Sequence, residues 1–207
     1  ISMKIYPKTI PIFPLSGVIF FPKTNLPLNI FEQKYLNLVN DAFDNDKFMG
    51  MVQSKKEKNS VYQIGCLGKI NDYQKSKDGR VLINLTGVTR FEIENEIDNK
   101  KLYREFKVNY KKFEDDLLNA SYEFKTNNLM QKAKIFFERS GLLLNWKELD
   151  KLEHAQKINT LAMISPVTNE EKQKLLETVT LEEKIKILEN IISFYLHEVD
   201  FNNRTIQ

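Results

Sequence analysis

The sequence predicts an α+β fold, with a mostly antiparallel barrel or sandwich at residues 3–118 and a helical bundle at residues 119–207. Two observations support this assignment. Hydrophobic residues alternate with a period of two up to about residue 118, as in strands, and recur every 3.6 residues after it, as in helices. Six of the seven glycines and five of the six prolines lie in the first part, where closely spaced turn signals are typical of small all-β structures.

The predicted strands cover residues 9–15, 48–53, 62–73, 81–97 and 103–113. Pro11 and Pro14 restrict the first strand to a sheet edge or a bulge, because proline cannot donate a ladder hydrogen bond. Gly65 and Gly68 predict a bend in the third strand. The polar segment that follows ends in Asp78-Gly79, which is a strong signal for a hairpin turn into the fourth strand.

The helices are predicted from the 3.6-residue spacing of apolar residues and from capping residues at the helix ends. Asn29, with Glu32 three residues later, resembles a capping box at the start of a helix that runs to Phe43. In the second part, one helix starts near Tyr122 and ends at Gly141. Three further helices begin at capping signals and cover residues 145–166, residues from 168 onward and residues 180–199.

Composition excludes several classes of protein. The net charge of +3 is too small to indicate a nucleic-acid or membrane protein. A lone cysteine excludes an intramolecular disulfide and indicates a reducing compartment. The sequence shows neither a membrane-length apolar run nor a secretion signal, so we expect a cytoplasmic protein. One cysteine and two histidines are too few soft ligands for a structural zinc site, and we expect no cofactor and no metal.

The sequence predicts no catalytic residues. It holds no phosphate-binding loop, no nucleophile elbow and no zinc-binding helix motif. Cys66 lies in an apolar strand, where a small buried hydrophobe is the simplest interpretation. His154 and His197 fall on predicted helices, and acidic pairs such as Asp115-Asp116 lie at helix starts, where their charge suits the helix dipole. We therefore expect that the chain is not an enzyme.

The sequence also resembles a known family. The similarity is carried, in order along the chain, by residues 12–22 (IFPLSGVIFFP), 26–32 (LPLNIFE), 50–53 (GMVQ), 62–70 (YQIGCLGKI), 85–91 (LTGVTRF), 103–106 (YREF), 159–164 (NTLAMI) and 170–177 (EEKQKLLE). Together these segments resemble the substrate-binding N-terminal domain of Lon (ATP-dependent protease La). The resemblance implies a PUA-like β-barrel followed by a helical bundle. It also implies that the chain, which ends before the ATPase and the Ser–Lys protease parts, is similar to stand-alone bacterial relatives of this domain.

From this resemblance we expect a non-catalytic module that binds unfolded or extended polypeptide. Such a module needs accessible apolar surface. Phe20, Phe21 and Leu26 are the candidate substrate-binding residues, because two adjacent phenylalanines in an extended strand point to opposite faces. The alternative is that one phenylalanine packs in the barrel and the other packs under the helical part.

Two further interpretations remain open. Glu32 and Arg90, each next to an aromatic residue, are candidates for a structural ion pair that fixes the helix on the barrel. Lysine-rich segments at residues 55–58, 75–80, 100–101 and 111–112 could support RNA binding, although interleaved acids make nucleic acid the weaker choice. A third possibility is an oligomerisation or adaptor subunit that acts with a protease in trans, with the apolar stripe of the last helix as interface.

Overall fold

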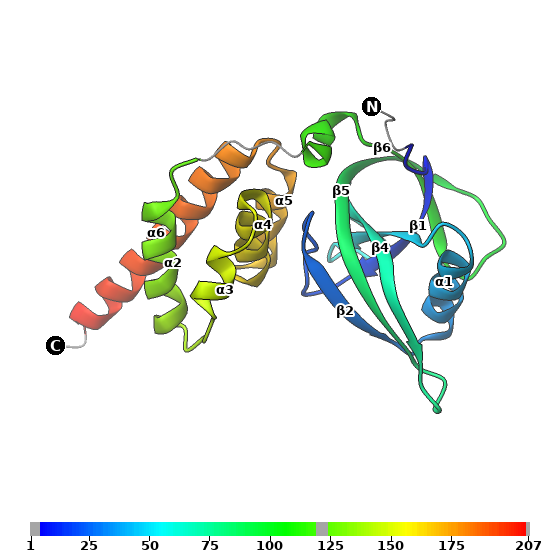
Figure 1. Ribbon diagram of the computed structural model, residues 1–207, viewed down its shortest axis with the longest axis horizontal. Helices are drawn as coiled ribbons and strands as arrows, with labels where there is room; N and C mark the ends of the chain where they lie inside the picture. The colour runs from blue at the N-terminus through cyan, green and yellow to red at the C-terminus, as the bar shows by residue number, and fades with distance from the viewer. Residues whose placement is uncertain (1–4, 119–123, 206–207) are drawn as a thin grey trace. The chain divides into compact units, whose positions relative to one another are not determined.

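The computed structural model describes residues 5–118 and 124–205, and the chain divides into two compact units, Ile1–Leu118 and Asn119–Gln207. The first unit contains β1 (Thr9–Leu15), β2 (Asn25–Ile30), α1 (Gln33–Asp44), β3 (Phe48–Gln53), β4 (Ile64–Lys75), β5 (Val81–Ile97), β6 (Arg104–Asn109) and the 3-10 helix η1 (Lys111–Leu117). The second contains α2 (Asn127–Arg139), α3 (Trp146–Asp150), α4 (His154–Ile164), α5 (Asn169–Glu177) and α6 (Leu181–Thr205). The α+β class is as predicted (Figure 1).

The sheet of the first unit has the order β2-β5-β4-β3-β1-β6 and is mixed, since β1 and β3 run parallel and the other paired strands run antiparallel. The expected mostly antiparallel barrel does not close through all six strands. In the part of the chain that the structure describes, β2 pairs with β5 alone and leaves an open edge. β5 is long enough to pair with two strands in succession along one of its sides, since its 17 residues span about 55 Å. Its first half pairs with β2, and its second half pairs with β6, so the sheet curls around one long strand.

β1 lies between β3 and β6, so it is not an edge strand, which was one of the two alternatives that its prolines left open. The two pairings, however, use different halves of the strand. β6 pairs with Thr9 to Ile12, and β3 pairs with Ile12 to Leu15. Pro11 and Pro14 therefore each have one side without a neighbouring strand, where a missing N–H costs nothing.

One apolar cluster fills the inside of the curled sheet. It consists of Ile10, Ile12, Val52, Val61, Leu67, Phe91, Ile93, Phe106 and Val108. Two glycines make room for the Phe91 ring. A Cβ atom on Gly50 would lie 3.1 Å from Phe91 Cζ, and one on Gly65 would lie 2.7 Å from it. Of the two glycines that predicted a bend, Gly65 thus also allows a large ring into the core, and the β4–β5 register does shift beside Gly68.

Helix α1 begins at Gln33, so the expected capping box at Asn29 is wrong. Asn29 lies in β2 opposite Leu82, and Glu32 is the N-cap without a side-chain cap bond. The helix is held on the sheet by Tyr103, whose hydroxyl donates to Asp41 at 2.6 Å. Burial and this contact raise the pKa of Tyr103 to about 12, so the hydroxyl remains a donor at neutral pH.

The helices of the second unit follow the predicted caps with one exception. Gly141, at a φ of 72°, follows the end of α2 as expected, while the predicted start near Tyr122 lies outside the described residues. The predicted helix at residues 145–166 is two helices, because the Glu153 carboxylate accepts the N–H groups of Ala155 and Gln156 and starts α4. Among residues 5–118 and 124–205, no helix has both the length and the apolar character to cross a membrane.

The predicted capping box at the start of α5 is present. The Thr168 hydroxyl accepts the Glu171 N–H at 3.1 Å, and Glu171 accepts the Thr168 N–H. Tyr195 of α6 also donates to Glu171 at 2.6 Å. Burial alone would raise the pKa of Glu171, but these hydrogen bonds outweigh it and lower the pKa.

We expect Thr168→Ala to lower the free energy of unfolding by about 1 kcal/mol, because α5 loses its N-cap. Urea unfolding monitored by circular dichroism measures this change. Thr126→Ala is the matched control, because Thr126 is the N-cap of α2 but its hydroxyl accepts no N–H from that described helix. Equal losses in the two variants would contradict the prediction.

Candidate functional site

The predicted substrate-binding loop is buried, so the expectation that it supplies exposed apolar surface is wrong. Phe20 is 2% exposed, Phe21 0% and Leu26 8%. Leu26 lies in β2 opposite Leu85, on the buried side of the strand alternation. Phe20 packs close to Gly68, where a Cβ atom would lie 3.0 Å from the ring.

Backbone contacts hold this loop against β5. Lys23 N–H donates to the Gly87 carbonyl at 2.9 Å, and Gly87 N–H donates to the Thr24 carbonyl at 2.8 Å. The buried Thr24 hydroxyl donates to the Phe21 carbonyl at 2.7 Å. The approach is so close that a Cβ atom on Gly87 would lie 2.3 Å from the Phe21 carbonyl oxygen. The adjacent phenylalanines are therefore structural.

The expected ion pair between Glu32 and Arg90 is also absent from the part of the chain that the structure describes. Glu32 is exposed at the start of α1. Arg90 instead binds Asp116 of η1, with Nη2 2.8 Å from Oδ1 and Nε 3.0 Å from Oδ2. The Phe113 ring lies 4.2 Å from the guanidinium. This pair therefore fixes η1 on the sheet, whereas the predicted ion pair was expected to fix α1.

Two of the exposed apolar side chains of the first unit, Phe31 and Leu82, belong to a surface that we call the outer face. It consists of the solvent-facing residues of β2, β5 and β4, with the residue that follows β2: Pro27, Asn29, Phe31, Leu82, Asn84, Asp72 and Gln74. Asn29 and Gln74 flank Leu82, and Pro27 and Asp72 flank Asn84 in the ladder. Phe31 is 66% exposed and Leu82 is 44% exposed.

A row of hydrogen-bonded side chains runs along the outer face. The Asn84 amide donates to Asn71 Oδ1 at 2.8 Å, Asn71 donates to the Thr86 hydroxyl, and that hydroxyl donates to Asn25 Oδ1 at 3.0 Å. Within the described residues, the row leaves Asn84 Oδ1 as an acceptor and Asn25 Nδ2 as a donor without a partner. An acceptor can bind the N–H group of a peptide, and a donor can bind its carbonyl group.

The outer face is also hollowed. A shallow depression of about 370 Å³ is lined by the β2 residues Pro27, Leu28 and Asn29 and by neighbouring residues of β4 and β5. Pro27 has no N–H to offer a further strand, which disfavours strand addition at the open edge of β2. The face, with its apolar side chains and amides, is thus the better candidate for contact with a partner.

The sequence contains a signal for this surface in the segment that forms β2. From Asn25 to Phe31, exposed and more buried residues alternate, with Leu26 and Ile30 inside and Pro27, Asn29 and Phe31 outside. Phe31 also lies within the helix that the sequence predicts from Asn29 to Phe43, so the predicted helix obscures the strand that precedes Phe31. Among the described residues, no group of three or more His, Cys, Asp or Glu side chains could hold a metal ion.

Comparison with known families gives one match over most of the chain. The family model described as the ATP-dependent protease La (LON) substrate-binding domain matches residues 9–193. Similar proteins include the Lon protease of Cytophaga hutchinsonii, 26% identical over 83% of this chain, and that of Flavobacterium johnsoniae, 31% identical over 45%. The chain spans 22% and 12% of the length of these two relatives.

Solved structures show the same fold. The Lon N-terminal domain protein from Xanthomonas campestris superposes with a TM-score of 0.66 at 19% identity, covering 89% of this chain and 97% of that one. The N-terminal domain of the Mycobacterium avium complex Lon protease gives a TM-score of 0.64 at 16% identity, covering 90% and 98%.

Proposed function

Because this chain belongs to the family of the ATP-dependent protease La (LON) substrate-binding domain, we propose that it binds extended polypeptide through the outer face and releases it unchanged. In this proposal the curled sheet corresponds to the PUA-like barrel implied by the resemblance. The polypeptide is a substrate that the chain presents to a Lon-type protease. The observation that supports this binding site is the exposure of Phe31 and Leu82 on the face that also carries Asn84 Oδ1 and Asn25 Nδ2.

Apolar contact supplies the affinity in this proposal. A buried aromatic side chain removes about 150–250 Å² of surface from water, and each Å² contributes about 25 cal/mol. Covering the exposed two thirds of Phe31 therefore contributes about 3 kcal/mol before the cost of ordering the peptide. Unfolded chains display the apolar side chains that this contact requires, whereas folded proteins bury most of theirs.

Hydrogen bonds to the peptide backbone make binding in this proposal tolerant of the peptide's sequence. Asn84 Oδ1 and Asn25 Nδ2, at the ends of the side-chain row, can pair with the carbonyl and N–H groups that every residue of an extended peptide carries. Binding therefore depends on extension and on a few apolar side chains, and only weakly on the order of residues.

We expect the double variant Phe31→Ser/Leu82→Asn to bind an extended Leu- and Phe-rich peptide at least about tenfold more weakly, since about 1.4 kcal/mol is lost per factor of ten. Fluorescence anisotropy with a labelled, C-terminally amidated 20-residue peptide measures the Kd, and mass spectrometry checks that the peptide is intact. Both side chains are exposed, so the melting temperature should change little.

The matched control is Leu102→Asn, because Leu102 is 63% exposed in the same unit but lies between β5 and β6. It should bind as the wild type does. Equal Kd values for all three proteins would overturn the proposed site. Tight binding of single-stranded RNA that weakens steeply with salt, without peptide binding, would replace this function with nucleic-acid recognition.

A further inference from the structure

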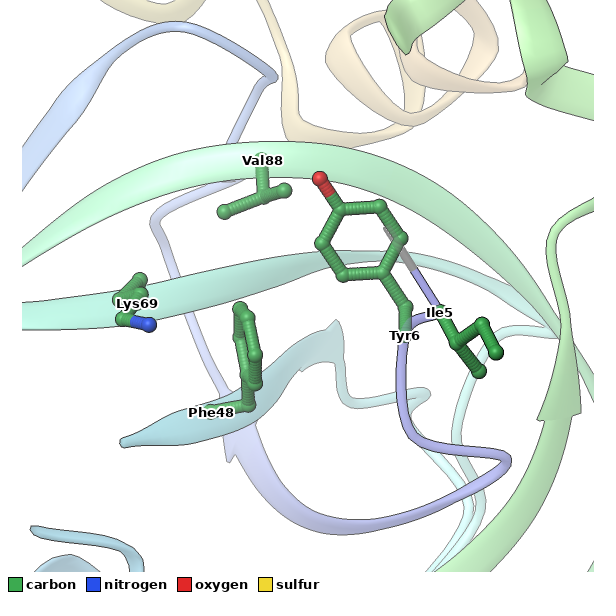
Figure 2. A pocket seen from close by; sticks show the side chains of 5 residues that line it. All are labelled: Ile5, Tyr6, Phe48, Lys69 and Val88. Carbon is green, nitrogen blue, oxygen red and sulfur yellow. The ribbon is translucent and has the colours of Figure 1, made fainter. Parts of the chain in front are cut away.

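A second hollow, which we call the Tyr6 pocket, lies in the first unit and shares no lining residue with the depression on the outer face. It has a volume of about 320 Å³ and is lined by Ile5, Tyr6, Phe48, Lys69 and Val88. Figure 2 shows the Tyr6 ring on one side and Phe48, Lys69 and Val88 on the other. Phe48 and Lys69 are direct neighbours in the β3–β4 ladder, so the sheet fixes an aromatic ring and an ammonium group side by side.

The ammonium of Lys69 is available to an anion. Its Nζ atom lies 4.6 Å from the centroid of the Phe48 ring, a cation–π contact that leaves its N–H donors unused. In the described part of the chain, no carboxylate forms a salt bridge with it. The Asp46 carboxylate, two residues before Phe48, does not serve as the partner of Lys69, and its Oδ1 accepts the Phe48 N–H at 3.0 Å.

The Tyr6 side chain provides an apolar wall and a second donor. Its ring packs edge-on against Phe48, with centroids 5.7 Å apart, and lies 5.9 Å from the ring of Tyr110. The Tyr110 hydroxyl donates to the Pro7 carbonyl, whereas the Tyr6 hydroxyl has no hydrogen-bond partner among the described residues. Burial raises the pKa of Tyr6, so its hydroxyl keeps its proton at neutral pH.

These groups select a ligand with an anionic and an apolar part close together. The volume is at the lower end of ligand pockets, which leaves room for one side chain and one small charged group. In a polypeptide, only the C-terminal residue combines a carboxylate that is not part of a side chain with an apolar side chain on the same carbon. Peptide groups in the interior of a chain carry no charge for Lys69 to bind.

We propose that the Tyr6 pocket binds the free C-terminal carboxylate of a polypeptide together with its last apolar side chain. Lys69 and Tyr6 donate to the carboxylate, and the rings of Phe48 and Tyr6, with Val88, surround the side chain. This inference rests on the proposed function, since it names which end of a bound polypeptide the chain recognises.

The test compares two labelled octapeptides that both end in Ala-Phe, one with a free acid and one with a C-terminal amide. We expect the wild type to bind the acid about tenfold more tightly, because a hydrogen-bonded charge is lost in the amide. Lys69→Gln should remove this preference, and Tyr6→Phe should reduce it about threefold. Lys77→Gln, in the exposed β4–β5 turn, is the matched control and should keep it.

Equal binding of acid and amide by the wild type, or an undiminished preference in Lys69→Gln, overturns the proposal. Displacement of the acid peptide by 3-phenylpropionate at an equal concentration overturns the assignment to a polypeptide, because a small carboxylate would then suffice. The amidated 20-residue peptide keeps the two proposals apart. Its binding through Phe31 and Leu82 can persist when the acid preference fails, whereas failure of that binding is evidence against the outer face.

Discussion

Replacing Asp116 with alanine is expected to lower the free energy of unfolding by about 3–5 kcal/mol, the usual cost of removing one partner of a buried ion pair. The side chains of Arg90 and Asp116 are only 3% and 9% exposed. The Asp116 carboxylate accepts hydrogen bonds from three nitrogen atoms of Arg90, namely the backbone N, Nε and Nη2. The variant leaves the buried guanidinium without this carboxylate and loosens η1 from the sheet.

Urea unfolding followed by circular dichroism measures the loss. The control is Asp78→Ala, which removes the Arg80–Asp78 bridge in the hairpin turn, where both side chains are more than half exposed. Surface pairs of this kind contribute about 0–1 kcal/mol. A loss from Asp116→Ala no larger than that of the control would show that the pair has little role in holding η1.

Gly87→Ala is expected to cost about 3 kcal/mol, at the upper end for overpacking, because the added methyl group meets backbone. Its nearest neighbours would be the Phe21 carbonyl oxygen at 2.3 Å and Pro22 Cα at 3.1 Å. Neither can move without separating the loop from β5 and breaking the two backbone hydrogen bonds between them. The same change should expose the Lys23–Thr24 peptide bond, so trypsin should cleave after Lys23 faster than in the wild type.

Gly68→Ala is the control for this prediction, because the closest atom to its added methyl group is the ring edge of Phe20 at 3.0 Å. A ring can tilt by a few tenths of an ångström, so we expect a loss of about 1 kcal/mol and no faster cleavage after Lys23. If Gly87→Ala is no less stable than Gly68→Ala, the loop does not depend on this close approach.

The elements set by neighbouring residues could be predicted from the sequence. The pattern of apolar residues identified β3, β4, β5 and β6, and Asp78-Gly79 identified the turn, in which Gly79 has a φ of 88°. Thr168 and Glu171 identified the start of α5, and Gly141 identified the end of α2. In each case the deciding interaction joins residues at most a few positions apart, so a short stretch of sequence contains all its participants.

The candidate site was decided by contacts between distant parts of the chain. Arg90 pairs with a residue 26 positions away, and Asn25 joins Thr86 across 61 positions. Two adjacent phenylalanines, Phe20 and Phe21, suggested an exposed apolar patch. Both are buried, because Gly87 allows β5 to approach the loop closely. Phe31 has the spacing of a helix-core residue, yet it lies in solvent, because β2 pairs with β5 and α1 starts only at Gln33. The sequence by itself therefore determined the family resemblance and most of the elements, but not β2, the start of α1 or the break between α3 and α4. Only the tertiary structure decided which apolar side chains remain in water, because burial depends on which distant strand arrives beside each residue.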